Sequence, residues 1–119
     1  MIIDDILTIL TELSVPAQVG DYQTNGNYPP VYAVILPLYD TFEAADNLPD
    51  VELQTASVEL YSAGDWREKA KAIKDKALLS GLTVTDSRFI MRDTDTRYFH
   101  YTISLEREYE WVPTDFEGD

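Results

Sequence analysis

The stretch VELQTASVELYSAGDWREKAKAIKDKALLSGL, residues 51–82, decides the fold because it joins a strand pattern directly to a helix pattern. Residues 51–61 alternate, with Ala56, Val58 and Leu60 on one face and polar side chains on the other. This alternation is the period of a strand. We therefore expect a half-buried strand over these residues.

The helix that follows has a defined beginning and end. Asp65 can accept backbone N–H groups as the N-cap, and Glu68 three residues later completes a capping-box pattern. Gly81 suits the left-handed conformation that often follows a helix. The pattern predicts a helix that ends at about Ser80. Its apolar stripe consists of Trp66, Ala70, Ile73 and Ala77.

The N-terminal sequence MIIDDILTILTEL repeats apolar residues at three- and four-residue spacing. It predicts a helix over about 3–13, with Asp4 and Asp5 near the end where acids suit the helix dipole. Pro16 ends this helix, because proline disfavours the α conformation of the residue before it. A short extended piece over 17–22 then leads to the turn-forming sequence TNGNYPP.

The next segments predict a strand and a long connection. VYAVIL, residues 31–36, is a continuous apolar run bounded by prolines, as expected of a buried strand. PLYDTFEAADNLPD, residues 37–50, contains two prolines and four acids. We expect it to be a long connection, which is either an arm that reaches a partner or a mobile loop.

The remaining sequence predicts a closing antiparallel hairpin. Residues 82–91 and 98–109 are rich in β-forming side chains, and DTDT at 93–96 lies between them. In the second of these segments one face is apolar. It carries Phe99, Tyr101, Ile103 and Leu105.

The predicted order is therefore α-β-β-β-α-β-β, in one α+β domain over residues 1–119. We expect two helices packed on an antiparallel or mixed sheet, most simply an antiparallel one. The end of the chain, residues 112–119, is expected to be frayed.

Composition bounds the class of protein. The chain has 119 residues, of which 45% are hydrophobic and 12% aromatic, too many large apolar side chains for a disordered polymer. The sequence contains no cysteine, which excludes disulfides and thiolate metal sites. No basic region precedes the first apolar run, and no apolar stretch approaches about 20 residues. We expect no signal peptide and no membrane span, and a cytoplasmic protein is the simplest interpretation.

The charge is large and unevenly distributed. The formal net charge is −13, and residues 1–66 contain eleven acids and neither lysine nor arginine. Such a field repels phosphate backbones, which disfavours nucleic-acid binding by the acidic half. Either the acids only keep the protein soluble, or acidic and basic faces of different copies meet. Five cations fall within ten residues: Arg67, Lys69, Lys71, Lys74 and Lys76.

The sequence contains no recognisable catalytic pattern. A hydrolytic triad needs a histidine between a nucleophile and a carboxylate, and the single histidine, His100, lies on the polar side of a predicted strand. Asp93 and Asp95 resemble the start of a calcium loop, but the required glycine and glutamate are missing. A turn that bonds its own backbone is expected there. Carboxylate pairs have no specificity among 22 acids. We predict no catalytic residue, no cofactor and no metal ligand.

Two long segments carry a likeness to a known family: PPVYAVILPLYDTFEAADN, and VELYSAGDWREKAKAIKDKALLSGLTVTDSRFIMRDTDTRYFHYTISLEREYE. They contain a Pro-Tyr strand, an Asp-Asn loop, a Leu-Tyr-Ser strand end, a Trp-led helix and an Asp-Thr … Tyr-x-His-Tyr pattern in the last hairpin. Over about residues 28–110 the chain resembles the small tail-terminator, or tail-completion, proteins of long-tailed bacteriophages and prophages.

This resemblance implies a structural protein without catalysis or cofactor. Such proteins form a hexameric ring at the head-proximal end of the phage tail, where the ring ends polymerisation of the tail tube and joins tail to head. The implied partners are further copies of the chain, the tail-tube protein and the head-tail connector protein. DNA would pass through the ring without specific binding, and no membrane is involved. The implied location is the virion, after synthesis in the host bacterial cytoplasm.

Three other classes of protein fit some of the same features. A phage-encoded acidic inhibitor that mimics DNA would share the charge, but it would bind a basic enzyme as a monomer or dimer. A head-tail connector adaptor would share the assembly role. An enzyme would need a pocket with convergent acids of perturbed pKa.

A ring of identical copies needs two different patches on each subunit. We expect apolar side chains in segment 37–50 to dock on a neighbouring copy, with cations of the second helix setting the register. The apolar contacts should dominate, because exposed ion pairs contribute only about 0 to 1 kcal/mol each. The alternative for the cations is a solvated helix face. The interface candidates are Leu38, Tyr39, Phe42, Arg67, Lys71 and Lys74.

Overall fold

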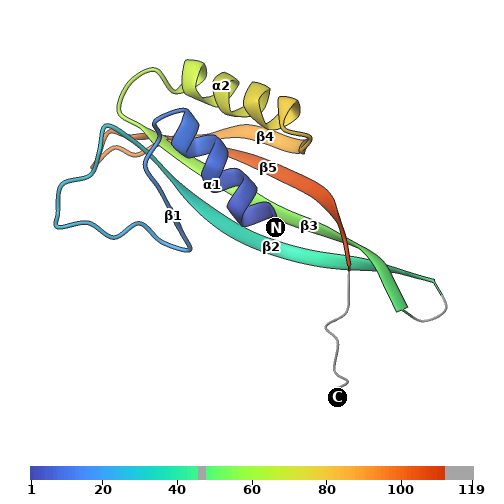
Figure 1. Ribbon diagram of the computed structural model, residues 1–119. Helices are drawn as coiled ribbons and strands as arrows, with labels where there is room; N and C mark the ends of the chain where they lie inside the picture. The colour runs from blue at the N-terminus through green and yellow to red at the C-terminus, as the bar shows by residue number, and fades with distance from the viewer. Residues whose placement is uncertain (46–47, 112–119) are drawn as a thin grey trace.

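The computed structural model describes residues 1–45 and 48–111. Its two helices and five strands follow the predicted order (Figure 1). Boundaries differ from the sequence-based ones by one to three residues, except in the segment after residue 36. The elements are α1 (Ile2–Glu12), β1 (Ala17–Val19), β2 (Val31–Ala45), β3 (Leu48–Ser62), α2 (Trp66–Leu79), β4 (Thr83–Arg92) and β5 (Phe99–Glu110).

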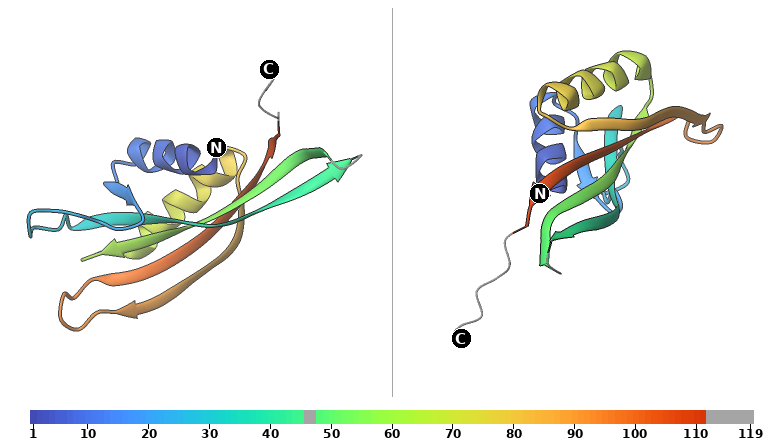
Figure 2. Two further views of the ribbon diagram at one scale, coloured as in Figure 1. Left: turned by 90° about the horizontal axis from the view of Figure 1, so that it is seen from below. Right: turned by 90° about the vertical axis from the view of Figure 1, so that its right-hand side faces the viewer.

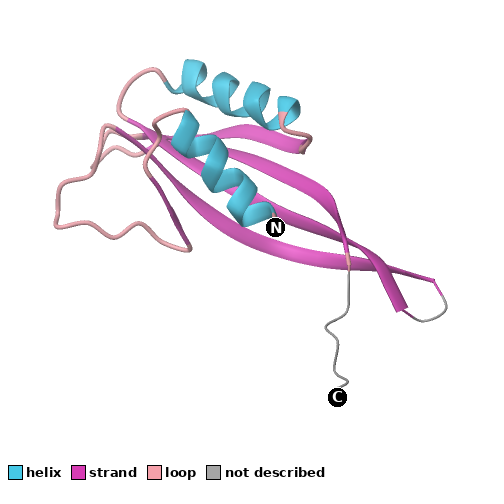
Figure 3. Cartoon of the chain, in the orientation of Figure 1, coloured by secondary structure: helices cyan, strands magenta, loops and turns pink. Residues whose placement is uncertain are grey.

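All five strands form one sheet in the order β1-β2-β3-β5-β4. Strand β1 is parallel to β2, and every other pair is antiparallel, so the sheet is mixed. A purely antiparallel sheet was the simpler expectation, but the connection over residues 20–30 brings the chain back so that β2 starts beside β1 and runs parallel to it. Both helices lie on the same face of the sheet (Figures 2 and 3), which gives a two-layer α+β fold.

The hydrophobic core lies between the two helices and the sheet. Helix α1 buries its predicted stripe, and α2 buries the small side chains Ala70 and Ala77 together with Ile73. Small residues on α2 bring its backbone close to the strands, while β-branched and leucine side chains fill the sheet side. The largest fully buried apolar residues are Ile6, Leu10, Ile35, Val58, Leu60, Ile73, Ile103 and Leu105.

The helix ends follow the sequence signals. Asp65 accepts the backbone N–H of Glu68 through Oδ1 at 3.2 Å, and Gly81, with φ of +91°, ends α2 in the left-handed region. Helix α1 ends in a similar way at Ser14, which has φ of +59° and is followed by Pro16. Because Ser14 is not a glycine, this position carries some backbone strain.

The predicted connection over 37–50 is wrong. Residues 37–45 extend β2 and residues 48–50 extend β3 into one long antiparallel hairpin, in which each strand has 15 residues. Residues 46–47 of the predicted connection lie outside the described residues. Proline is tolerated at position 37 of β2 for two reasons. It lies beside a register shift, and no other described strand pairs with the outer side of β2 at this point. Tyr39, Thr41 and Phe42 favour the extended conformation, which outweighs the turn-forming composition.

Strand β3 is more buried than a half-buried strand. Its apolar face, with Val58 and Leu60, is inaccessible, but Thr55 and Ser57 on the other face are also buried. Strand β3 is central, with β2 on one side and β5 on the other. Neighbouring strands and their side chains therefore cover both of its faces.

Candidate functional site

The outer end of the β2–β3 hairpin, residues 38–45 and 48–53, is here called the arm. Figures 1 and 2 show that it extends past the helical layer. Leu38, Tyr39 and Phe42 are exposed on it, with between 46% and 62% of their surfaces accessible. Large apolar side chains concentrated in five residues of one strand are unusual on an isolated domain. The arm is thus the first candidate contact surface.

The three arm side chains do not share a face. Tyr39 pairs with Thr55 and Phe42 pairs with Glu52, so the side chains of Tyr39 and Phe42 point to opposite faces of the hairpin. Leu38 lies at the register shift between Pro37 and Tyr39. The ring of Phe42 also meets the ring of Trp111 edge-on, with centroids 5.1 Å apart. A partner that contacts both Tyr39 and Phe42 must therefore meet the edge of the hairpin rather than one face.

Buried polar groups fix the base of the arm to helix α1. The backbone N–H of Ile2 donates to Gln54 Oε1 at 2.8 Å, and Gln54 Nε2 donates to Glu52 Oε1 at 2.8 Å. Desolvation, followed by the charge of neighbouring Glu52, raises the pKa of Asp40 above its ordinary value. The arm therefore leaves the body of the protein in a defined direction.

The structure does not bring the three helix cations to the arm of the same copy, and each has an intramolecular contact. Arg67 lies over the ring of Trp66 at 5.3 Å, and Lys71 Nζ is 2.6 Å from Asp75 Oδ2. Lys74 is half-buried and donates to the Tyr101 hydroxyl at 3.1 Å. Lys74 thus helps to hold α2 on the sheet, whereas Arg67 and Lys71 remain accessible.

Strand β4 forms a second exposed surface that sequence analysis did not single out. Phe89, Ile90 and Met91 are consecutive and between 41% and 49% accessible. Arg88 and Arg92 flank them, and both arginines are exposed. From Arg88 onward, all residues of β4 are exposed and partly buried residues no longer alternate with them. This strand lies at the edge of the sheet, and α2 covers only part of it.

A cluster of aromatic side chains gathers at the other end of the sheet, on the face without helices. Tyr32 is its centre, with ring centroids 4.6 Å from Tyr22 and 4.9 Å from Tyr61. Tyr61 stacks in turn on His100 at 4.5 Å. The members come from a loop, three strands and the last turn, and only the strand register brings them together. They are Tyr22, Tyr28, Tyr32, Tyr61, Tyr98 and His100.

The hydroxyl groups of this cluster hold loops in place. Tyr98 donates to the carbonyl of Pro29 at 2.6 Å and so ties the last turn to the segment before β2. Burial raises the pKa of Tyr32 to about 12, with neighbouring tyrosines adding to the effect, and burial also raises the pKa of Tyr61. These phenols stay neutral at physiological pH, so the cluster is a polar packing unit.

His100 is held inside the same face. Its Nε2 is 2.7 Å from Glu59 Oε1, and Thr102 Oγ1 donates to Glu59 Oε2 at 2.7 Å. In the described part of the chain, Glu59 is the only side chain that bonds this imidazole. The placement on the polar side of the strand is as predicted, but the side chain is largely buried.

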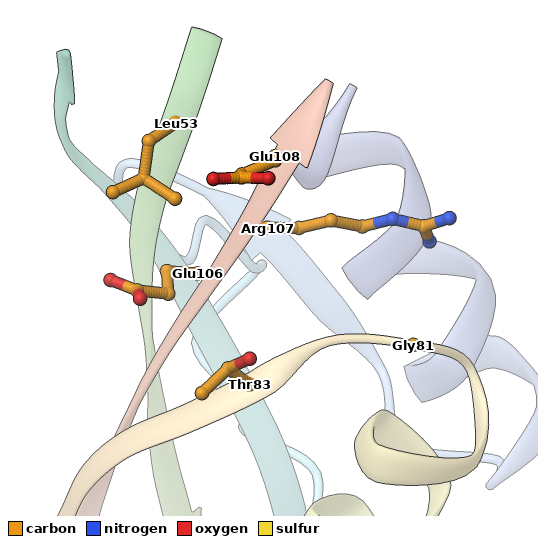
Figure 4. Close-up of a pocket in the computed structure, with 6 residues that line it drawn as sticks. All are labelled: Leu53, Gly81, Thr83, Glu106, Arg107 and Glu108. Carbon is orange, nitrogen blue, oxygen red and sulfur yellow. The ribbon is translucent and has the colours of Figure 1, made fainter. Parts of the chain in front are cut away.

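Several cavities border the sheet, and two of them bear on the groups described above. One of about 140 Å³ is lined by the aromatic cluster and the turn that contains Asp93. The other, of about 400 Å³, is bordered by Glu106 and Glu108 (Figure 4). Figure 4 shows the Arg107 side chain directed to the opposite side of β5, toward the helices, where its Nη1 is 3.3 Å from Asp5 Oδ2. Arg107 is nevertheless among the residues that line this second cavity, so its wall combines two carboxylates with the arginine.

The Asp93 turn bonds its own backbone, as predicted. Asp93 Oδ1 accepts the backbone N–H groups of Asp95 at 2.8 Å and Thr96 at 3.0 Å. These bonds lower the pKa of Asp93, with the bond from Thr96 the larger cause. Within residues 1–45 and 48–111, no three side chains among His, Asp and Glu converge in a way that could hold a metal ion.

No protein-family model matches the chain, and no curated protein matches its sequence significantly. Over the residues described above, neither helix is long and apolar enough to cross a lipid bilayer.

Proposed function

We propose that this protein is a structural subunit of a phage virion that forms a ring at the head-proximal end of the tail. The ring ends tail-tube polymerisation and joins the tail to the head, and the subunit performs no catalysis. The proposal starts from the resemblance over residues 28–110 to tail-terminator proteins. The architecture is compatible with it, because the α+β order expected for the chain is present.

The observation that carries the proposal is the arm. Leu38, Tyr39 and Phe42 remain exposed on a hairpin whose base is fixed to α1 through Gln54. Burying a large apolar side chain contributes about 1.5 to 3 kcal/mol, so these residues favour association with another protein surface. A rigid projecting hairpin is suited to reach a neighbouring subunit or the tail tube.

The charge supports passage of DNA through such a ring. With a formal net charge of −13 on each subunit, several copies around a channel repel phosphate groups. Phosphate contacts supply most non-specific affinity for DNA, and an acidic lining removes them. DNA then crosses the channel without being retained.

A second candidate function is an acidic inhibitor that mimics DNA. The eleven acids and the absence of lysine and arginine in residues 1–66 favour it. Such an inhibitor would act as a monomer or dimer on a basic enzyme. The mass of the native particle separates the two functions directly.

The test is native mass spectrometry of the purified protein, alone and with the tail-tube protein. We expect a closed oligomer of defined copy number. Replacing Tyr39 and Phe42 by serine should abolish that oligomer and the capping of tails, while the melting temperature of the monomer falls only slightly. Leu79→Ser, which removes an exposed leucine from α2, is the matched control and should still assemble.

If the mass corresponds to a monomer or dimer under all these conditions, the proposal of a ring is wrong. The proposal is also wrong if a Tyr39/Phe42 variant assembles normally and yields tails of normal length.

A further inference from the structure

The sheet has two different edges, and each has a segment without a strand partner on its outer side, with a register shift at Leu38 in β2 and at Ile90 in β4. On one side, β1 covers β2 only from Ala33 to Ile35, and Gly20 adds one backbone bond to Ile35. Beyond Ile35, no described strand covers the outer side of β2. On the other side, β4 has β5 as its single partner in the described chain. Uncovered strand edges present unpaired N–H and C=O groups to another strand.

The two edges differ in their side chains and charge. The outer part of β2 carries exposed Leu38 and Tyr39, together with the exposed acid Asp40 and no lysine or arginine. Strand β4 carries the exposed triplet Phe89-Ile90-Met91 between Arg88 and Arg92. Asp86 is its one acid, so the net charge of this strand is positive. Both edges thus expose apolar surface, and their net charges are opposite in sign.

This charge pattern selects the pairing. Two arm edges together would place acids against acids, and two β4 edges would place arginines against arginines, and like charges across a strand pair are destabilising. An arm edge against a β4 edge brings opposite charges together and buries apolar side chains from both. The favoured contact is therefore between two different patches, which is the head-to-tail type that closes into rings.

We propose that the arm edge of β2 pairs with the β4 edge of a second copy, so that the sheet continues from subunit to subunit around the ring. This inference rests on the proposed ring and names its interface. Because the edges lie on opposite sides of one sheet, each copy receives one neighbour and reaches the next. The arm lies beside the C-terminal end of β5. Successive copies are therefore displaced from one another along the strand direction, as neighbouring strands in a closed barrel are. Tyr39 and Phe42, on opposite faces of the hairpin, then both contact the same partner strand.

Cysteine cross-linking tests the contact, since the chain has no cysteine of its own. Thr41→Cys and Ile90→Cys proteins are mixed and treated with a short bis-maleimide; Thr41 is exposed on the arm, and its substitution leaves Tyr39 and Phe42 intact. We expect covalent dimers in the mixture and none from either variant alone. A chain with both substitutions should give a ladder that ends at the copy number of the ring. Thr41→Cys mixed with Lys71→Cys tests the helix face instead, and Leu79→Cys is a control for random collision.

Charge reversal provides a second, independent measurement. Arg88→Glu with Arg92→Glu should weaken assembly of otherwise unchanged subunits roughly tenfold, since a few exposed pairs contribute about 1 kcal/mol or somewhat more together. Adding Asp40→Lys should restore part of the assembly. Circular dichroism and melting curves of each variant report whether the fold is intact.

If the ring forms but Thr41→Cys cross-links to Lys71→Cys, the edge pairing is wrong while the ring stands. The same holds if charge reversal does not weaken assembly. Absence of any ring with the tail-tube protein present overturns both proposals.

Discussion

At the scale of single residues, Asp40 makes the stability of the folded protein depend on pH. Desolvation and the nearby carboxyl of Glu52 raise its pKa above the ordinary 3.8 in the folded protein. The folded state therefore holds this proton more tightly than the unfolded chain does. The contribution of the group to stability is complete below pH 3.8 and decreases as the pH rises through the raised value.

We predict that Asp40→Asn raises the melting temperature at pH 7 and has no effect below pH 3.8, where the aspartate is already protonated. Thermal unfolding followed by circular dichroism across this pH range measures the difference. Asp95→Asn, which removes the same charge from the exposed turn, controls for the general benefit of lowering the net charge. An Asp40→Asn protein that is less stable than the parent at pH 7 would contradict the prediction.

At the scale of elements, the packing of α2 on the sheet depends on its first residue. Trp66 stacks on Tyr101 at 5.0 Å and contacts Phe89 at 5.2 Å, while the remaining buried side chains of α2 are mostly alanine. Trp66 is only partly buried, so its contribution is smaller than that of a fully enclosed tryptophan. Its large ring nevertheless supplies much of the apolar contact between this helix and strands β4 and β5.

We predict that Trp66→Ala lowers the free energy of unfolding by about 2 to 3 kcal/mol, just below the usual cost for a fully buried aromatic residue. The melting temperature should fall by roughly 10 °C. Trp111→Ala is the matched control, because Trp111 is exposed and meets only the ring of Phe42 among the aromatic side chains described. A Trp66→Ala protein that melts within a degree or two of the parent would show that α2 does not depend on this contact.

At the scale of the whole molecule, charge is segregated along the chain. Residues 1–66 provide α1 and the first three strands without a single lysine or arginine, so all nine cations lie on α2 and the last hairpin. The consequence is a molecule that is acidic overall and yet has a basic edge at β4. Such a molecule can join copies of itself while it repels polyanions.

We predict that neither the monomer nor the assembled particle retains duplex DNA in an electrophoretic mobility assay, even at about 50 mM salt, where phosphate contacts are strongest. Retention at that salt which disappears at about 200 mM would reveal a cationic path for the backbone and would contradict the proposed channel.

Several local features could be predicted from the sequence because each depends on neighbouring residues. Apolar periodicity placed both helices, alternation placed the inner face of β3, and Asp65 and Gly81 marked the ends of α2. The self-bonded turn at Asp93 followed from the same local chemistry. Hydrogen bonds and side-chain faces within a few residues are fixed by these patterns, whatever the rest of the chain does.

Only the tertiary structure decided the features that depend on which strands pair. Composition indicated a loop over 37–50, yet residues 37–45 are a strand that pairs with β3, because an extended partner satisfies their backbone groups. The aromatic cluster around Tyr32, the exposed edge of β4 and the internal role of Lys74 also join residues distant in sequence. Amino-acid patterns determined the elements of this protein, but register and sheet order decided its surfaces, since those are set by the sum of long-range contacts rather than by any local stretch.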